Sequence, residues 1–182
     1  GGLLGLNAAV SQAENSTTVI ADIGSNTNLQ IGTSLAVTAD NTTNQTAEVT
    51  GVVGGAAAIG ASVVTATSNS NTFAYLADHV TVNNSNTDRP DVSVTAHSSD
   101  INIANAKAGV GGVIAGSAAV AETKTGGTTQ AYIGANSELA ADEVEVDAEH
   151  NAQFNATIDS TSASLLGASG AVVKHTVNST VQ

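Results

Sequence analysis

A row of acidic residues near the C-terminal end is the part of this sequence best suited to chemistry. Glu143, Glu145, Asp147 and Glu149 alternate with Val and Ala in the segment EVEVDAE. If this segment is a strand, the four carboxylates line one outer face at intervals of about 7 Å. Ca²⁺ would relieve their mutual repulsion, although single carboxylates at this spacing do not form the oxygen cage that calcium needs. The pattern favours a solvated acidic face and leaves calcium as the one cofactor to test.

No other residues form a recognisable catalytic arrangement. We expect a surface position for each of the four histidines, His79, His97, His150 and His175. When the repeats of this sequence are aligned with one another, His97 falls at the same position as Asp40 and Glu149. Histidine therefore does not recur at equivalent positions. No serine lies in a Gly-x-Ser-x-Gly motif, and no glycine-rich run has the spacing of a phosphate-binding loop or a dinucleotide site. The sequence therefore predicts no enzyme activity, no catalytic residue and no cofactor-binding residue.

The composition excludes several classes of partner and of fold. Four basic and 16 acidic residues give a net charge of −12, which disfavours nucleic acid and anionic membrane surfaces as partners. Aromatic residues make up only 2% of the chain, and Cys, Met and Trp are absent. Small and β-branched residues must therefore fill the interior, which suits the thin bore of a regular β-fold better than a round core.

The elements that position these residues follow a repeat. A glycine-rich apolar run occurs four times, at Gly1–Ser11, Gly51–Thr65, Gly109–Ala121 and Ser164–Val173. The spacings are 55, 55 and 52 when the runs are aligned on Gly5, Gly60, Ala115 and Gly167. Recurrence at such intervals is typical of stacked repeat proteins. We expect one continuous segment of a longer chain, with units at 1–55, 56–110, 111–163 and, incompletely, 164–182.

Alternation of apolar and polar residues indicates that each unit is built from strands. It is clearest in Leu35–Ala39, Val92–Ala96 and Val144–Ala148, where we expect Val and Ala to face inward. The sequence therefore predicts an all-β fold, a parallel β-helix (β-solenoid) of about three and a half repeats, each of about 52–55 residues. Two or three coils per unit both fit the spacing.

Clusters of Asn, Ser, Thr, Asp and Gly are expected to form the turns between strands. They lie at Gly24–Asn28, Asp40–Gln45, Ser68–Asn71 and Thr123–Gly127. The second unit carries an apparent insertion of about four residues at Asn83–Asp91, with the only proline of the chain. Repeat proteins place such insertions in surface loops.

The run Gly51–Thr65 is apolar at both alternating positions. Residues 57, 59, 61 and 63 would lie on one face and residues 56, 58 and 64 on the other, with one face turned inward and the other outward. The outer face then needs a cover, and we favour a long loop of the same chain over lateral packing between fibres. The uncharged stretch Gly51–Ala66 is too short to span a membrane, so we expect no transmembrane segment.

The same elements resemble the repeat regions of giant secreted bacterial adhesins, the filamentous-haemagglutinin-like and leukotoxin-like filamentous adhesins. The resemblance lies in GASVV at Gly60–Val64, TTQAYIG at Thr128–Gly134 and the two VxVxA strands at Val92–Ala96 and Val144–Ala148. It implies a parallel β-helix that is exported across the outer membrane and forms a stalk or adhesive fibre at the cell surface.

The resulting functional hypothesis is a structural or adhesive stalk segment of a bacterial cell-surface or secreted fibre. Its partners would be the neighbouring repeats of the same chain, with cell-surface or glycan targets left open. The alternative is an extracellular filament subunit that self-assembles through strand ends or through its Gly/Ala-rich face.

Overall fold

The computed structural model describes residues 2–84 and 89–182, and most of these residues lie in β-strands. The strands are β1 (Leu4–Ile23), β2 (Asn28–Gln30), β3 (Ser34–Gly54), β4 (Ala57–Leu76), β5 (Thr81–Asn83), β6 (Asp91–Ile133), β7 (Glu138–Leu139) and β8 (Val144–Val181). All pairs are parallel, and no helix occurs in these two ranges. The predicted all-β, parallel architecture is confirmed.

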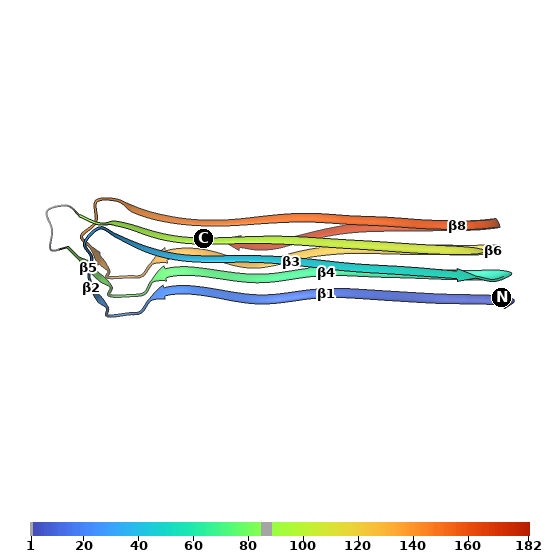
Figure 1. Cartoon of the computed structure of the whole chain (residues 1–182), viewed down its shortest axis with the longest axis horizontal. Coiled ribbons are helices and arrows are strands. Elements are labelled where there is room, and N and C mark those ends of the chain that lie inside the picture. The colour runs from blue at the N-terminus through green and yellow to red at the C-terminus, as the bar shows by residue number, and fades with distance from the viewer. Residues whose placement is uncertain (1, 85–88) are drawn as a thin grey trace.

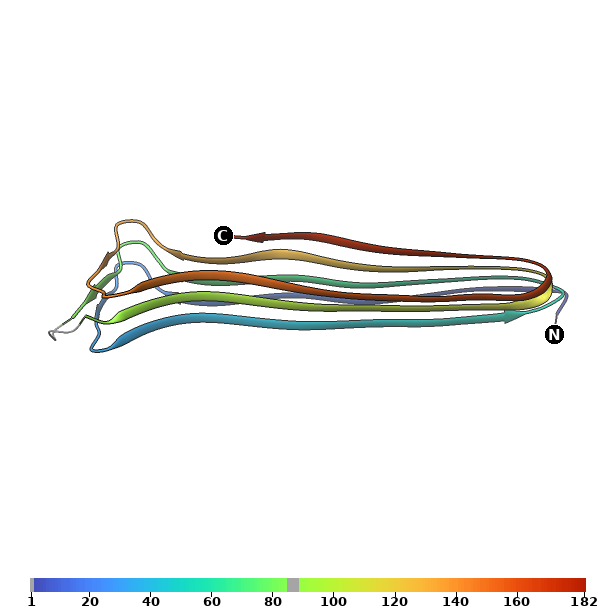
Figure 2. The same ribbon diagram turned by 90° about the horizontal axis from the view of Figure 1, so that it is seen from above.

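The long strands run along the length of the molecule and form two sides that face each other (Figures 1 and 2). β1 and β4 lie on one side, together with the C-terminal halves of β6 and β8. β3 lies on the other side, together with the N-terminal halves of β6 and β8. β6 and β8 pass around the bend that joins the two sides, while β2, β5 and β7 stack at the opposite end. The result is a curled, solenoid-like sheet.

Each sequence unit supplies one circuit of this path. Leu4 pairs with Ala57, which pairs with Ile114, which in turn pairs with Leu166, so the residue number rises by 53, then by 57 and then by 52 from one circuit to the next. The expectation of two or three coils per unit was therefore wrong, because strands of about 20 residues use up a whole unit in a single turn. The Tyr75 and Tyr132 rings stack at 4.8 Å, which is the spacing of adjacent strands.

The register confirms part of the sequence alignment and corrects one position. Val37, Val94 and Val146 pair in successive circuits, as the alignment predicted. Gly5, however, pairs with Ala58 and not with Gly60. Paired residues of β2 and β5 differ by 53 in residue number, as Asn28 and Thr81 do, whereas those of β3 and β6 differ by 57, as Ser34 and Asp91 do. The four extra residues confirm an insertion at Asn83–Asp91. Residues 85–88 of this insertion lie outside the described residues.

The interior changes character along the strands. An apolar cluster that includes Val37, Leu76 and Val94 fills the end near the short strands, and Ala and Val fill the narrower end near the bend. Between them lies a belt of buried polar side chains, which includes Asn41, Thr43, Gln45, Ser68, Ser70, Thr72, Asp100, Asn102, Thr123 and Thr125.

This polar belt corrects three of the four predicted turns. Asp40–Gln45, Ser68–Asn71 and Thr123–Gly127 lie within long strands, and only Gly24–Asn28 is at a chain reversal. Turn propensity was overridden because alternate side chains of these clusters face inward, where they bond to one another. At the true reversals, Asn26, His79 and Asn136 take the left-handed conformation, with φ of 57°, 60° and 56°.

Candidate functional site

The predicted acidic row lies on the outer face at the start of β8. Each carboxylate extends a column of the β3 side, so that Glu145 pairs with Ser93, Asp147 with Thr95 and Glu149 with His97. The four side chains stay exposed and spread along the strand. No group of three His, Cys, Asp or Glu residues in ranges 2–84 and 89–182 is placed to hold a metal ion. The arrangement is an acidic strip, and calcium binding by it stays a prediction.

His97 is the centre of a small ionic cluster on this strip. Its column is Asp40, His97 and Glu149, as the sequence alignment predicted. His97 Nδ1 lies 3.3 Å from Asp40 Oδ1, and His97 Nε2 lies 3.4 Å from Asp147 Oδ2. All three side chains are between 45% and 69% exposed, so water screens these contacts. With a carboxylate beside each ring nitrogen, the imidazole bridges three adjacent strands.

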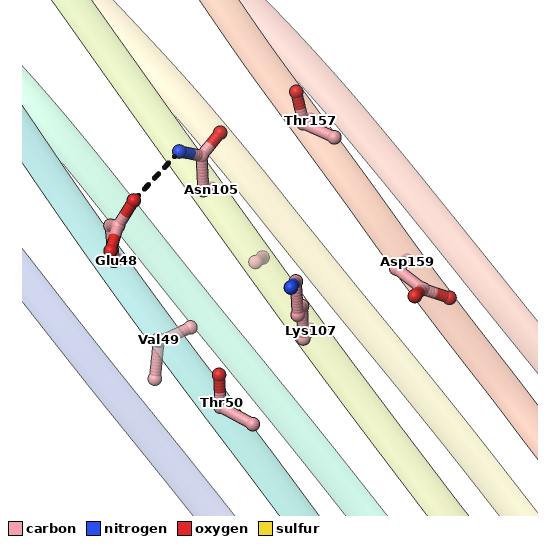
Figure 3. A pocket seen from close by; sticks show the side chains of 8 residues that line it. Glu48, Val49, Thr50, Asn105, Lys107, Thr157 and Asp159 are labelled. Carbon is pink, nitrogen blue, oxygen red and sulfur yellow. Dashed lines mark hydrogen bonds between the residues drawn. The ribbon is translucent and has the colours of Figure 1, made fainter.

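A shallow depression lies farther along the same outer side. Figure 3 shows its lining, which comes from β3, β6 and β8: Glu48, Val49, Thr50, Asn105, Ala106, Lys107, Thr157 and Asp159. Its volume is about 300 Å³. The Asn105 amide donates a hydrogen bond to Glu48 Oε1 at 3.0 Å. Carboxylate, amide, ammonium and hydroxyl groups lie together here and suit hydrogen bonding to a polar ligand. The sequence reasoning did not identify this site, since its residues lie in three different circuits.

The most connected side-chain cluster is inside the molecule, around Asp100. Its Oδ1 accepts hydrogen bonds from Thr43 at 2.5 Å, Ser68 at 2.8 Å and Ser70 at 2.5 Å. Its Oδ2 lies 2.9 Å from His150 Nε2, although this contact is too bent to be a hydrogen bond. The His150 side chain is buried, with only 2% of it exposed. The expectation of a surface position for this histidine was therefore wrong.

This cluster contains the hydroxyl, imidazole and carboxylate groups of a catalytic triad. Its hydroxyl group, however, is not accessible to a substrate. The Thr129 hydroxyl lies 3.3 Å from His150 Nδ1, so threonine, histidine and aspartate follow one another. In a hydrolase the hydroxyl must reach a substrate. Thr129 and Asp100 are fully buried, and neither residue lines the depression between Glu48 and Asp159. The cluster joins β3, β4, β6 and β8 to one another and has the character of a structural network.

The outer face of the β1 side carries an apolar surface near the bend. The paired strands form four rows, Leu4–Ala57–Ile114–Leu166, Leu6–Ile59–Gly116–Ala168, Ala8–Ala61–Ala118–Gly170 and Val10–Val63–Val120–Val172. We call these four rows the apolar ladder. Of the two apolar faces of this run, the one with residues 57, 59, 61 and 63 faces outward. The favoured cover by a loop of the same chain was wrong. Ile59 is 62% exposed and Val63 is 37% exposed, so no part of the described chain covers them.

A charged border separates the ladder from the rest of the β1 side. Glu122 pairs with Lys174 in the next circuit, and its carboxylate lies 2.9 Å from Lys124 Nζ and 3.0 Å from Lys174 Nζ. The hydrogen bond with Lys124 lowers the pKa of Glu122, partial burial raises it, and the bond with Lys174 lowers it again, with a net decrease from the usual 4.5.

Comparison with known proteins identifies no relative of this chain. No family model, no curated protein and no solved structure matches it. Within the described residues, no helix is long and apolar enough to cross a membrane.

Proposed function

We propose that this chain is a segment of a parallel β-helix, with about three and a half repeats, that serves as a structural or adhesive stalk of a bacterial surface or secreted fibre. The observation that carries the proposal is the in-register parallel pairing of the long strands, circuit upon circuit, from β1 to β8. Such stacking makes a quasi-one-dimensional protein in which each circuit depends mainly on its neighbours.

The side chains support a mechanical role rather than a chemical one. The interior is filled by Ala, Val, Ser and Thr, which stack in repeated columns across circuits. The one extensive polar network found in the described residues is sealed inside and joins strands to one another. Apart from the apolar ladder, the outer faces are mostly polar, and a net charge of −12 keeps such a segment soluble outside the cell. The proposal assigns no catalysis to the chain.

An adhesive contribution of the segment would come from the depression between Glu48 and Asp159. Its hydrogen-bonding groups suit a polar ligand such as a glycan, and its lining comes from three adjacent strands. Cell-surface or glycan targets are the partners that this chemistry favours. The extracellular location follows from the stalk role and belongs to the same proposal.

Surface labelling tests the location and role. An antibody against this segment should label intact cells that produce the protein, and protease added to intact cells should remove the signal. Labelling only after the cells are permeabilised would contradict the proposal.

Sedimentation of the purified chain tests the alternative of an end-to-end filament. A stalk segment stays a small species that does not grow into fibres, whereas stacking through strand ends gives fibres that lengthen with concentration. The same experiment in about 1 mM Ca²⁺ and in chelator tests the acidic strip, because extracellular calcium modules bind in this range. We expect equal behaviour in both buffers, and calcium-dependent assembly would support metal binding, for which Glu143, Glu145, Asp147 and Glu149 are the candidate residues.

A further inference from the structure

The apolar ladder is the exposed apolar surface that the stalk role does not use. Nine of its 16 positions are Leu, Ile or Val, and the others are Ala or Gly. Its exposure is not limited to the first and last circuits, since Ile59 and Ile114 in the two middle circuits are 62% and 57% exposed. Leu3, Val113 and Leu165 extend the apolar surface at the bend. Contiguous exposed apolar patches of this kind mark interaction surfaces.

The distribution of charge leaves the ladder available to a second, equally acidic molecule. Residues 1–13, 51–66, 108–121 and 160–173 contain no charged side chain, although the whole chain carries a net charge of −12. The nearest charges are Glu122 and Lys174, and these are ion-paired to each other. Two copies can therefore bring their ladders together without placing like charges across the contact.

The chemistry of the ladder favours another protein sheet over a lipid surface. Segments that lie in a membrane interface combine apolar side chains with aromatic anchors and with Lys or Arg. The ladder has none of these residues. A flat, regular array of small and branched side chains is instead complementary to a copy of itself, as in the dry interfaces between paired sheets.

The area of the surface predicts the strength of the contact. Four strand widths of about 4.8 Å and eight residues of about 3.3 Å each give roughly 500 Å² per copy. Two copies would bury about 1,000 Å² in total, which is at the lower limit for a specific interface. Each further circuit would add about 130 Å².

We propose that the apolar ladder is a lateral interface, in which a second copy of this chain packs ladder against ladder about a twofold axis. The inference goes beyond the stalk role, since a stalk needs no lateral partner. Association of the 182-residue chain is weak and strengthens with the number of circuits. A stalk built from more circuits would then pair side by side into thicker fibres.

Single cysteines test this interface directly, because the chain has no native cysteine. Ala118→Cys places a thiol in the third row of the ladder, and Thr46→Cys places one on the opposite outer face; both positions are exposed. Under mild oxidation at high protein concentration, we expect Ala118→Cys to form disulfide-linked dimers at least tenfold faster than Thr46→Cys. Equal rates would overturn the proposal.

A second pair of variants measures the equilibrium. Ala118→Asp should lower the association constant more than tenfold in sedimentation equilibrium, because a carboxylate would be buried against an apolar face. Thr46→Asp adds the same charge elsewhere and should lower it by less than a factor of two. Circular dichroism of all variants should stay strand-rich, since both sites face outward.

Two results would exclude the second copy as the occupant. One is a wild-type chain that stays monomeric at every concentration tested. The other is a monomer that co-sediments with phosphatidylcholine vesicles through the ladder, which would assign the surface to lipid. Either result would leave the stalk proposal standing, since the surface-labelling experiment tests it separately.

Discussion

At the scale of single residues, Asp100 is the buried charge at the centre of the interior polar network. Three hydroxyl groups from β3 and β4 donate to one of its oxygens, and His150 lies beside the other. A buried carboxylate with this many donors is stable only while the donors are present, and the donors need the carboxylate equally.

We predict that Asp100→Ala destabilises the chain by about 3–5 kcal/mol, because it leaves three buried hydroxyl groups without their acceptor and removes the carboxylate beside His150. Urea unfolding followed by circular dichroism measures the loss. Asp40→Ala is the matched control, since Asp40 is 69% exposed and pairs with a histidine on the surface; it should cost less than about 1 kcal/mol. Equal losses in the two variants would show that the network around Asp100 contributes nothing.

Glu122 gives the chain a dependence on pH in the acid range. Hydrogen bonds from Lys124 and Lys174 lower its pKa below 4.5 in the folded state. Its contribution to stability is therefore complete above the unfolded pKa and disappears as the pH falls through the lower folded value. The ion pairs lie near the surface, so their contribution is below about 1 kcal/mol.

Glu122→Gln tests this dependence. At neutral pH the variant should unfold at lower urea than the wild type, and the difference should shrink as the pH falls through the lowered folded pKa of Glu122, because the wild-type carboxyl then becomes neutral as well. A difference that persists at the acid end would assign the effect to packing of the side chain rather than to its charge.

Sequence reasoning missed the buried polar residues because it gave more weight to the turn and surface preferences of these residue types than to their place in the inward–outward alternation of the strand. Val37 and Ala39 face inward, and the same alternation places Asn41, Thr43 and Gln45 inward as well. The signal was thus present in the spacing, but the turn preference of Asn and Thr concealed it. His150 has the same parity as Ala148 and was assigned to the surface for the same reason.

At the scale of elements, the sequence predicts strand type and direction more reliably than register. Val37, Val94 and Val146 align correctly because polar residues flank them in each unit. In the glycine-rich run, a shift by two positions keeps every side chain on the same face and exchanges one small residue for another. The pattern therefore could not distinguish Ala58 from Gly60 as the partner of Gly5.

Gly127 marks an interruption of the pairing between β4 and β6. Regular pairing stops at Asn69 with Gly126 and resumes at Thr72 with Thr129. Gly127 has φ of 124°, and a Cβ at this position would collide with the carbonyl oxygen of Ser70. The Asn71 side chain accepts the hydrogen bond of the Thr128 amide at 3.0 Å in place of a backbone carbonyl.

We predict that Gly127→Ala costs at least about 1–3 kcal/mol, since both the backbone conformation and the space are unsuitable for a side chain. Gly170→Ala is the control, because a Cβ there meets no atom within 4 Å. That variant should be neutral or slightly stabilising, since alanine loses less chain entropy on folding. Thermal unfolding of the two proteins distinguishes these outcomes, and equal midpoints would contradict a strained backbone at Gly127.

At the scale of the whole molecule, the stacked circuits predict that one unit can be removed without loss of the fold. Deletion of residues 57–113 joins Ala56 to Ile114, and these residues lie at the same bend in successive circuits. β1 would then meet the C-terminal half of β6, which has the same alternation of inward and outward residues as β4. In a quasi-one-dimensional protein, such a deletion shortens the stack and leaves the remaining neighbours in contact.

The shortened chain should keep a strand-rich circular dichroism spectrum and should unfold cooperatively, although at lower urea because one circuit of contacts and Asp100 are lost. Its m-value should fall roughly in proportion to the buried surface removed. Deletion of residues 57–85 is the control: it removes the return strand β4 and joins the end of β3 to the start of β6, which runs parallel to β3, so it should prevent folding. If both deletions unfold the chain alike, the circuits do not act as exchangeable layers, and a stalk that grows by adding units would lose its physical basis.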